Sequence, residues 1–204
     1  MNFSRLMKHI KRLIKKLLLL VFQSSRHVKY GLLSENNIIG SVKCHQPALF
    51  NGEGTISFGN NVQIGVIPAK DYYNGYCYFD AKQKDSSIKI HDNVHINNNC
   101  SIVSDIAGIE ICSNTLIGAN VTISDSDFHN LHPKKRLLGK AISKKVFIDE
   151  NVFVGSSVTI LKGVSIGENT VIANSSVVTK SFPSNVIIGG NPAQVIRTLD
   201  EGKI

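Results

Sequence analysis

Apolar residues return at every sixth position along the second half of the chain. From residue 146 onward one set contains Ile148, Val154, Ile160, Ile166, Ile172 and Val178, and a second set lies two residues earlier, at Val146, Val152, Val158 and Val164. An α-helix does not produce this period, whereas short apolar-x-apolar strands joined by tight polar turns do. The pattern therefore predicts short strands that coil around one axis and stack to complete a shared core.

The same pattern continues upstream in three pieces. Its pairs are Ile56 with Phe58, Val62 with Ile64, Ile88 with Ile90, Val94 with Ile96, Cys100 with Ile102, Ile109 with Ile111, Thr115 with Ile117, and Val121 with Ile123. Two stretches interrupt the repeat, at 65–87 and at 124–145. Loops of this length in a compact body are usually functional or disordered. The first is rich in tyrosine, and it could line a substrate site, cap one end of the stack or contact a partner subunit.

Charge divides the chain into a basic arm and a neutral body. The net charge is +8, and residues 1–30 contain eight Lys or Arg and no Asp or Glu. Removing these eight from the 23 Lys and Arg leaves 15, which equals the 15 Asp and Glu. We therefore expect an N-terminal arm at 1–30, a repeat domain at 31–199 and a C-terminal tail at 200–204.

Residues 5–22 are predicted to form a basic amphipathic helix. Its apolar positions recur at helical spacing, at Leu6, Ile10, Leu13, Ile14, Leu17 and Leu18. The unbroken apolar run 17–22 is too short to span a bilayer, which takes about 20 residues. Such a helix suits the surface of an anionic membrane, and the alternative is packing of its apolar side on the body or on a neighbouring subunit. The arm has no aromatic interleaving and no nucleic-acid motif, so no nucleic-acid partner is expected.

The stretch VFIDENVFVGSSVTILKGVSIGENTVIANSSVVTK, residues 146–180, resembles the hexapeptide-repeat acyltransferases. The resemblance extends over 54–199 and points to the sugar and polysaccharide O-acetyltransferases near the maltose and galactoside acetyltransferases. It implies an all-β fold, the left-handed parallel β-helix. It also implies acetyl-CoA as co-substrate without a metal, and a homotrimer with the active site between subunits.

The segment ANVTISDSDFHNLHP resembles the catalytic loop of these O-acetyltransferases, and the resemblance assigns the general base to His129. A neutral imidazole suits removal of a hydroxyl proton near pH 7. His132 is the competing candidate. Asp125 or Asp127 could orient the ring through its other nitrogen, with turn capping as the alternative role for both.

Further site residues are implied by the same resemblance. Asn97 or Asn98 matches the position that contacts the acceptor sugar, although both also suit polar turns of the coil. The coenzyme A residues would be Ser156, Asn174, Thr179, Lys180 and Arg197, with solvated surface charge as the alternative for the two cations. Gln194 stands where some relatives carry a basic residue, which removes one phosphate contact.

Together these features predict transfer of an acetyl group from acetyl-CoA to a sugar hydroxyl, in a cell-surface polysaccharide or a lipid-linked glycan. The protein would be cytoplasmic, at the inner face of the cell membrane if the arm binds lipid. One alternative is a metal enzyme like the γ-class carbonic anhydrases, for which His91, His95, His129 and His132 are available. The other is a non-catalytic β-helix scaffold. The sequence leaves the sugar, its hydroxyl and the exact acyl group open.

Overall fold

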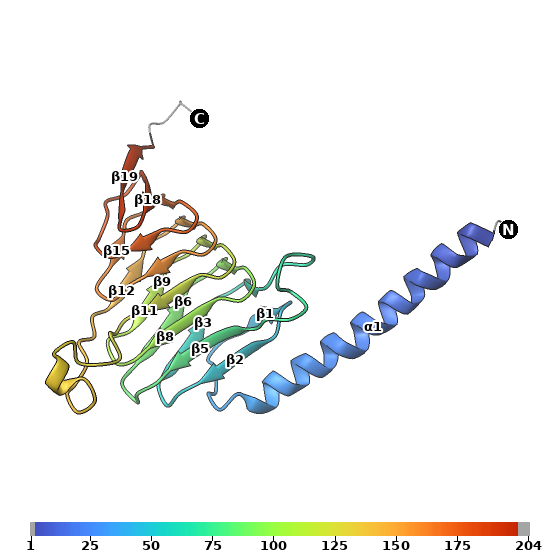
Figure 1. Ribbon diagram of the computed structural model, residues 1–204, viewed down its shortest axis with the longest axis horizontal. Coiled ribbons are helices and arrows are strands. Elements are labelled where there is room, and N and C mark those ends of the chain that lie inside the picture. The colour runs from blue at the N-terminus through green and yellow to red at the C-terminus, as the bar shows by residue number, and fades with distance from the viewer. Residues whose placement is uncertain (1–2, 200–204) are drawn as a thin grey trace.

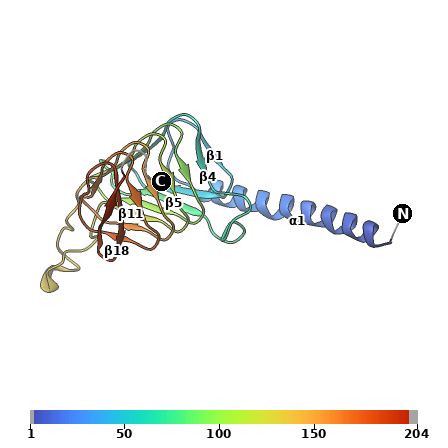
Figure 2. The ribbon, with the colours of Figure 1, turned by 90° about the horizontal axis from the view of Figure 1, so that it is seen from above.

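One long helix leads into a stack of triangular coils in the computed structural model, which describes residues 3–199 (Figure 1). The helix α1 spans Phe3–Leu33 and extends away from the first coils, as Figure 2 also shows. It continues three residues beyond the predicted arm at 1–30, into the segment assigned to the repeat domain. The predicted tail at 200–204 lies outside the described residues. Within residues 3–199 no helix is both long enough and apolar enough to cross a bilayer.

The strands of this part of the chain form three sheets, which are the three faces of a prism. The eight-stranded sheet has the order β1 (Val42–Cys44), β4 (Val62–Ile64), β7 (His95–Ile96), β10 (Leu116–Ile117), β13 (Phe153–Val154), β16 (Val171–Ile172), β18 (Val186–Gly190) and β19 (Ala193–Thr198). The six-stranded sheet has the order β17 (Val177–Val178), β14 (Thr159–Ile160), β11 (Thr122–Ser124), β8 (Ser101–Ser104), β5 (Cys77–Ala81) and β2 (Ala48–Asn51). The five-stranded sheet has the order β15 (Ser165–Ile166), β12 (Val146–Ile148), β9 (Ile109–Ile111), β6 (Ser87–Ile90) and β3 (Thr55–Phe58).

Each coil contributes one strand to each sheet, and the stacked strands run parallel. Residues at equivalent repeat positions are paired in register, as Ile117 is with Val154 and Val154 with Ile172. These side chains point inward and are at most 3% exposed. Only the closing hairpin of β18 and β19 is antiparallel among the described strands. Parallel sheets around a single core are typical of the left-handed β-helix, so the predicted all-β fold class is confirmed.

Three corners connect the sheets, and they are named here by the direction of the chain. The first corner leads from the eight- to the six-stranded sheet, the second from the six- to the five-stranded sheet, and the third back to the eight-stranded sheet. At the third corner Asn61, Asn93, Asn114, Asn151, Asn169 and Asn185 all have φ between 54° and 62°. Asparagine tolerates this left-handed conformation better than most residues. Side-chain amides also bond from coil to coil, as Asn151 Nδ2 does to Asn169 Oδ1 at 2.7 Å.

The first interruption is shorter than its predicted range of 65–87. Residues 77–81 form β5, which lies between β2 and β8. Cys77 and Phe79 point into the core and are fully buried. The prediction failed because the tyrosines beside them, in YCYF, conceal the alternation of period two. The loop at the first corner is therefore 65–76.

The second interruption lies at the second corner. It runs from the end of β11 to the start of β12 at Val146, so Ser124 belongs to the strand and not to the predicted loop. A single turn of 3₁₀-helix, η1 (Pro133–Lys135), lies in its middle. The segment 125–145, called the second-corner loop below, projects from the stack (Figure 1).

Candidate active site

His129 lies on the second-corner loop with its side chain exposed to solvent. Its Nδ1 lies 3.3 Å from the backbone carbonyl oxygen of Arg136. A carbonyl oxygen can only accept, so Nδ1 carries the hydrogen and donates it. In the neutral ring the lone pair is then on Nε2, which is the nitrogen that can take a proton. This contact favours the tautomer in which Nε2, and not Nδ1, is the nitrogen available to accept a proton.

Asp125 holds the base of the second-corner loop. Its carboxylate is fully buried, and its Oδ1 accepts the backbone N–H of Asp105 at 2.7 Å. Its Oδ2 accepts the Ser104 hydroxyl at 2.8 Å and the backbone N–H groups of Ala107 and Gly108 at 2.9 and 2.7 Å. Four donors surround this one carboxylate, which therefore fixes the turn that precedes β9 to the start of the loop.

Asp127 is bound to the next coil. Its Oδ1 accepts Lys162 Nζ at 2.7 Å, and its Oδ2 is buried without a hydrogen-bond partner. Neither Asp127 nor Asp125 forms the predicted bond to His129, because both carboxylates turn toward the stack. The backbone carbonyl of Arg136 takes that place. Lys162 was not identified from the sequence, although it precedes Lys180 by 18 residues, the length of one coil.

Phe128 adopts a φ of 56°, which is uncommon for a bulky residue. Its backbone N–H donates to Ser126 Oγ at 3.0 Å, and Ser126 in turn donates to Asp105 Oδ2 at 3.1 Å. These bonds hold the backbone immediately before His129 in a turn that presents the imidazole to solvent. His132, the competing candidate, is also exposed and immediately precedes the 3₁₀ turn.

Asn97 and Asn98 lie at the first corner, and the structure separates their roles. Asn98 is fully buried. Its Nδ2 donates to the carbonyl oxygens of Val66 and Lys70, both at 3.1 Å, and its Oδ1 accepts the Val66 N–H at 3.0 Å. Asn98 therefore holds the loop 65–76 and is not free to contact an acceptor.

Asn97 lines a pocket of about 200 Å³ on the outer side of the first corner. Its Oδ1 accepts the backbone N–H of Asn98 at 2.7 Å. The pocket is formed by the eight-stranded sheet and the start of the loop, with lining residues that include Gly65, His95, Leu116, Gly118 and Phe153. Of the two asparagines, Asn97 is the one placed to meet a ligand.

The residues predicted for coenzyme A are spread along the last coils. Ser156 and Asn174 are stacked at the first corner, where the Ser156 N–H donates to Asn174 Oδ1 at 2.8 Å. Thr179 and Lys180 follow β17 and are exposed, and Lys180 Nζ donates to Gln194 Oε1 at 2.8 Å. Arg197 is exposed on the outermost strand, β19.

The candidate site is therefore divided between two corners of the prism. Asn97, Ser156 and Asn174 lie at the first corner, whereas His129 lies on the loop at the second. The six-stranded sheet separates these corners within one chain. The imidazole and the first-corner residues of one chain therefore lie at opposite edges of this sheet.

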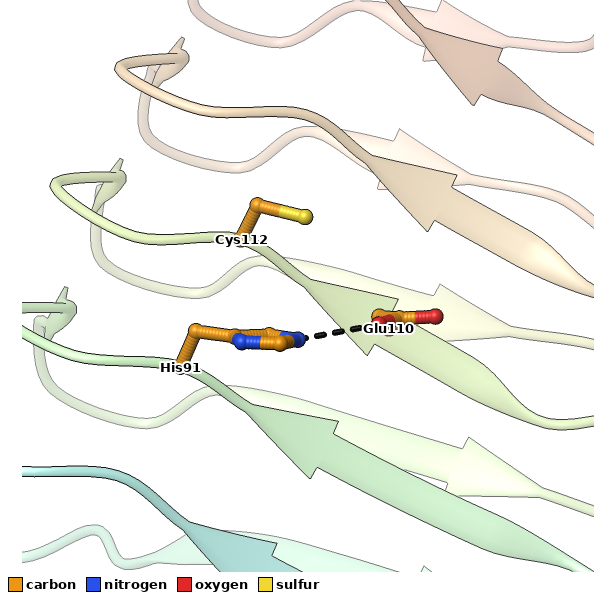
Figure 3. Close-up of side chains that lie close together, drawn as sticks. All are labelled: His91, Glu110 and Cys112. Carbon is orange, nitrogen blue, oxygen red and sulfur yellow. Dashed lines mark hydrogen bonds and ion pairs between the residues drawn. The ribbon is translucent and has the colours of Figure 1, made fainter.

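A separate cluster lies where β9 meets the third corner (Figure 3). The ligand atoms of His91, Glu110 and Cys112 lie within 4.8 Å of one another, the one such group among residues 3–199. Both oxygens of Glu110 are already engaged, one by His91 Nε2 at 2.9 Å and the other by Lys145 Nζ at 2.6 Å. Lys145 and then His91 hold the pKa of Glu110 at about 2, and burial raises that of Cys112.

This cluster is an ion-pair network in which a metal ion would compete with Lys145 for the carboxylate. His95, His129 and His132 are not part of it. The set of three histidines required by the carbonic-anhydrase alternative is thus not assembled within the described part of one chain.

Comparison with known proteins identifies the repeat. Residues 145–180 match the family described as bacterial transferase hexapeptide (six repeats). An Escherichia coli K12 protein named WbbJ, a lipopolysaccharide biosynthesis O-acetyl transferase, is 32% identical over 74% of this chain and 76% of its own length. The galactoside O-acetyltransferase of the same organism is 41% identical over 57% of this chain and 56% of that protein.

A solved structure of a galactoside acetyltransferase in complex with coenzyme A shares the fold. It is 26% identical, covers 88% of this chain and 83% of that chain, and has a TM-score of 0.53. The chain spans 51% to 58% of the length of three of the curated relatives that it matches, the galactoside O-acetyltransferase among them. The WbbJ match covers most of both proteins, and the chain therefore belongs to the hexapeptide-repeat acyltransferase family.

Proposed function

We propose that this protein transfers an acetyl group from acetyl-CoA to a sugar hydroxyl of a polysaccharide or lipid-linked glycan. Family membership supports the reaction class. The names of the relatives, a galactoside and a lipopolysaccharide O-acetyltransferase, support a glycan as acceptor. The donor is supported by the related structure solved with coenzyme A.

The observation that carries the proposal is the 3.3 Å contact between His129 Nδ1 and the Arg136 carbonyl oxygen. The His129 Nδ1–H donates to this carbonyl, which leaves Nε2 to remove the proton of the acceptor hydroxyl. The sugar oxygen then attacks the thioester carbon, and the carbon–sulfur bond breaks as the tetrahedral species collapses. The imidazolium returns its proton to the departing thiolate, so the ring ends the cycle neutral. No covalent enzyme intermediate is involved.

Coenzyme A is proposed to lie along the first corner and the last coils. A thin amide-bearing arm suits the backbone exposed around Ser156 and Asn174, where the Ser156 N–H already meets an amide oxygen. Thr179 would lie beside the arm. Lys180 and Arg197 would meet the phosphates as cations. Lys180 Nζ donates a hydrogen bond to Gln194 here, so the lysine must give up this bond to contact a phosphate.

A homotrimer would complete the site. The division between two corners supports it, because the His129 loop of one protomer could reach the first corner of the next. Exposed apolar residues lie on both surfaces: Leu116 and Phe153 are 47% and 48% exposed on the eight-stranded sheet, and Leu137 and Leu138 are 87% and 94% exposed on the loop. Burying them between copies would remove apolar surface from water.

The basic arm supports a location at the inner face of the cell membrane, with residues 5–22 in contact with lipid. Its apolar positions and its excess of positive charge both favour an anionic bilayer surface. A membrane-linked glycan would then be delivered near the coil stack.

The experiment is acceptor-dependent release of coenzyme A from acetyl-CoA across a panel of sugars and glycans. His129→Ala is compared with His132→Ala, a matched loss of an imidazole from the same loop. We expect release with at least one acceptor, a fall of 100-fold or more in His129→Ala, in keeping with the roughly 10²–10⁴-fold usual for a general base, and little change in His132→Ala. The opposite ranking would move the base to His132. Absence of release together with absence of coenzyme A binding would favour the scaffold alternative.

A further inference from the structure

The coil stack holds α1 through Arg26 and Tyr30. The Arg26 guanidinium donates to the carbonyl oxygens of Tyr72, at 2.9 Å, and of Gly75. Tyr30 stacks on Tyr76 with ring centroids 4.4 Å apart. These contacts lie in the C-terminal half of the helix.

Buried amide side chains hold in place the surface that α1 contacts. It is the loop 65–76, which Asn98 binds through its three bonds to Val66 and Lys70. Fully buried Gln46 adds a bond from its Nε2 to the Asp71 carbonyl at 2.9 Å. The tyrosine-rich loop is thus a clamp for the helix, anchored by amide side chains of the first coils.

One apolar stripe of α1 points away from this clamp. Ile10, Ile14, Leu17 and Val21 form one stripe and are 39% to 61% exposed. Gln23, which accepts Arg26, is two residues beyond Val21, and two residues correspond to about 200° around a helix. The stripe therefore lies nearly opposite the docked side, which argues against packing of this stripe on the protein's own body.

Charge indicates what covers the stripe. The helix carries eight Lys or Arg and no Asp or Glu. An anionic bilayer can accept the apolar stripe among its acyl chains while its headgroups meet the flanking cations. A second copy of α1 would bury the stripe but would bring two sets of eight positive charges together.

We propose that α1 lies flat on an anionic bilayer, with the stripe of Ile10, Ile14, Leu17 and Val21 in the membrane and the coil stack suspended from the opposite face. This deepens the proposed function by assigning the face, the lipid charge and the clamp around Arg26. The clamp would fix the orientation of the coil stack relative to the bilayer. It would also fix the position of the pocket that Asn97 lines, because the same loop contributes Gly65 to that pocket.

A pair of tryptophan variants tests the orientation. The chain contains no Trp, so each variant has a single indole. Leu17→Trp places it on the stripe, and Leu19→Trp places it two residues away, in the groove of about 400 Å³ between α1 and the loop. Both changes replace leucine without altering charge, so they form a matched pair.

The variants are mixed with vesicles of phosphatidylcholine containing 30% phosphatidylglycerol, with and without bromine on the acyl chains. We expect the Leu17→Trp emission to shift to the blue and to be quenched by bromine, and the Leu19→Trp emission to change little. Equal quenching of both, or quenching of Leu19→Trp alone, would overturn the orientation. A blue shift of the Leu17→Trp emission without bromine quenching, together with a larger mass in sedimentation, would show that a second copy covers the stripe.

Lipid charge provides the second measurement. Pure phosphatidylcholine vesicles should bind far less protein, and Lys11→Gln with Lys15→Gln should weaken binding to the anionic vesicles by roughly ten- to thirtyfold, at about 1 kcal/mol per cation. Unchanged binding of this double variant would refute the electrostatic part. Coenzyme A release with a soluble sugar, measured on the same samples, should stay at the wild-type rate. Failure of vesicle binding is thus distinguished from failure of the proposed acetyl transfer.

Discussion

Replacement of Asp125 by asparagine tests how the second-corner loop is held. Every group around the carboxylate is a donor: the hydroxyl of Ser104 and the backbone N–H groups of Asp105, Ala107 and Gly108. Asparagine keeps the shape of the side chain but exchanges one accepting oxygen for an NH₂ group. Wherever that group points, it faces a donor.

The magnitude follows from the geometry. With its oxygen in the Oδ2 position, the asparagine still accepts three bonds but without a charge, a loss of about 0.5–1 kcal/mol for each. Its NH₂ then opposes the Asp105 N–H, which leaves one buried donor unsatisfied at about 1–3 kcal/mol. The variant should therefore lose about 2.5–6 kcal/mol, which lowers the unfolding midpoint of a chain of this size by about 5–24 °C.

Thermal unfolding and amide exchange measure the effect globally and locally. In Asp125→Asn the amides of Asp105, Ala107 and Gly108 should exchange much faster than in the wild type. Asp127→Asn is the control, because its amide oxygen can still accept from Lys162 Nζ, and its midpoint should fall by less than half as much.

The result that would refute this reasoning is a stable Asp125→Asn variant that fails to release coenzyme A. A wild-type midpoint and wild-type exchange, combined with lost activity, would mean that the carboxylate acts on the imidazole as the sequence suggests. Parallel loss of stability and activity is the outcome that the four bonds predict.

Three further predictions follow from side-chain contacts. Lys145 and His91 lower the pKa of Glu110 from 4.5 to about 2. The contribution of the Glu110 carboxylate to the free energy of unfolding is therefore complete above pH 4.5 and is lost as the pH falls from 4.5 to about 2. In Glu110→Gln the free energy of unfolding in urea should depend less on pH across this range. Arg26→Met keeps the apolar stem but removes the bonds to the loop, so amide exchange should accelerate in 71–76 and remain unchanged in the later coils. Lys162→Met leaves the Asp127 carboxylate, only 19% exposed, without its cation; the unfolding midpoint should fall by several degrees and coenzyme A release should decrease.

The repeating part of the fold could be predicted because each coil repeats the same physical requirement. Inward positions such as Ile148 and Val154 must be apolar, and corner positions such as Asn151 must tolerate a positive φ. One strand of the second coil was missed because Cys77 and Phe79 alternate with the half-buried rings of Tyr76 and Tyr78, which hides the apolar period. Periodicity therefore predicts the stack well wherever outward positions are polar.

The chemistry of single polar residues could be predicted much less well. The sequence shows that Asp125 and Asn98 stand where function is expected, but their partners come from other coils. Asp125 meets Ser104, which precedes it by 21 residues, and Asn98 meets Val66, 32 residues earlier. Which donors surround a carboxylate depends on stacking, and only the assembled coils reveal that these two side chains hold loops.

The division of the site between two corners leads to a test by mixed assembly. If each site combines His129 of one protomer with the first corner of the next, His129→Ala and Asn174→Trp inactivate different halves of a site. Each variant alone should be inactive, because tryptophan would fill the exposed corner proposed for the pantetheine arm. In trimers reassembled from an equal mixture, a given site takes an intact histidine in half of the cases and an intact corner in half, so about a quarter of the wild-type release should return. Recovery of activity requires the two halves to come from different chains, whereas a site contained within one chain would stay inactive at every mixing ratio.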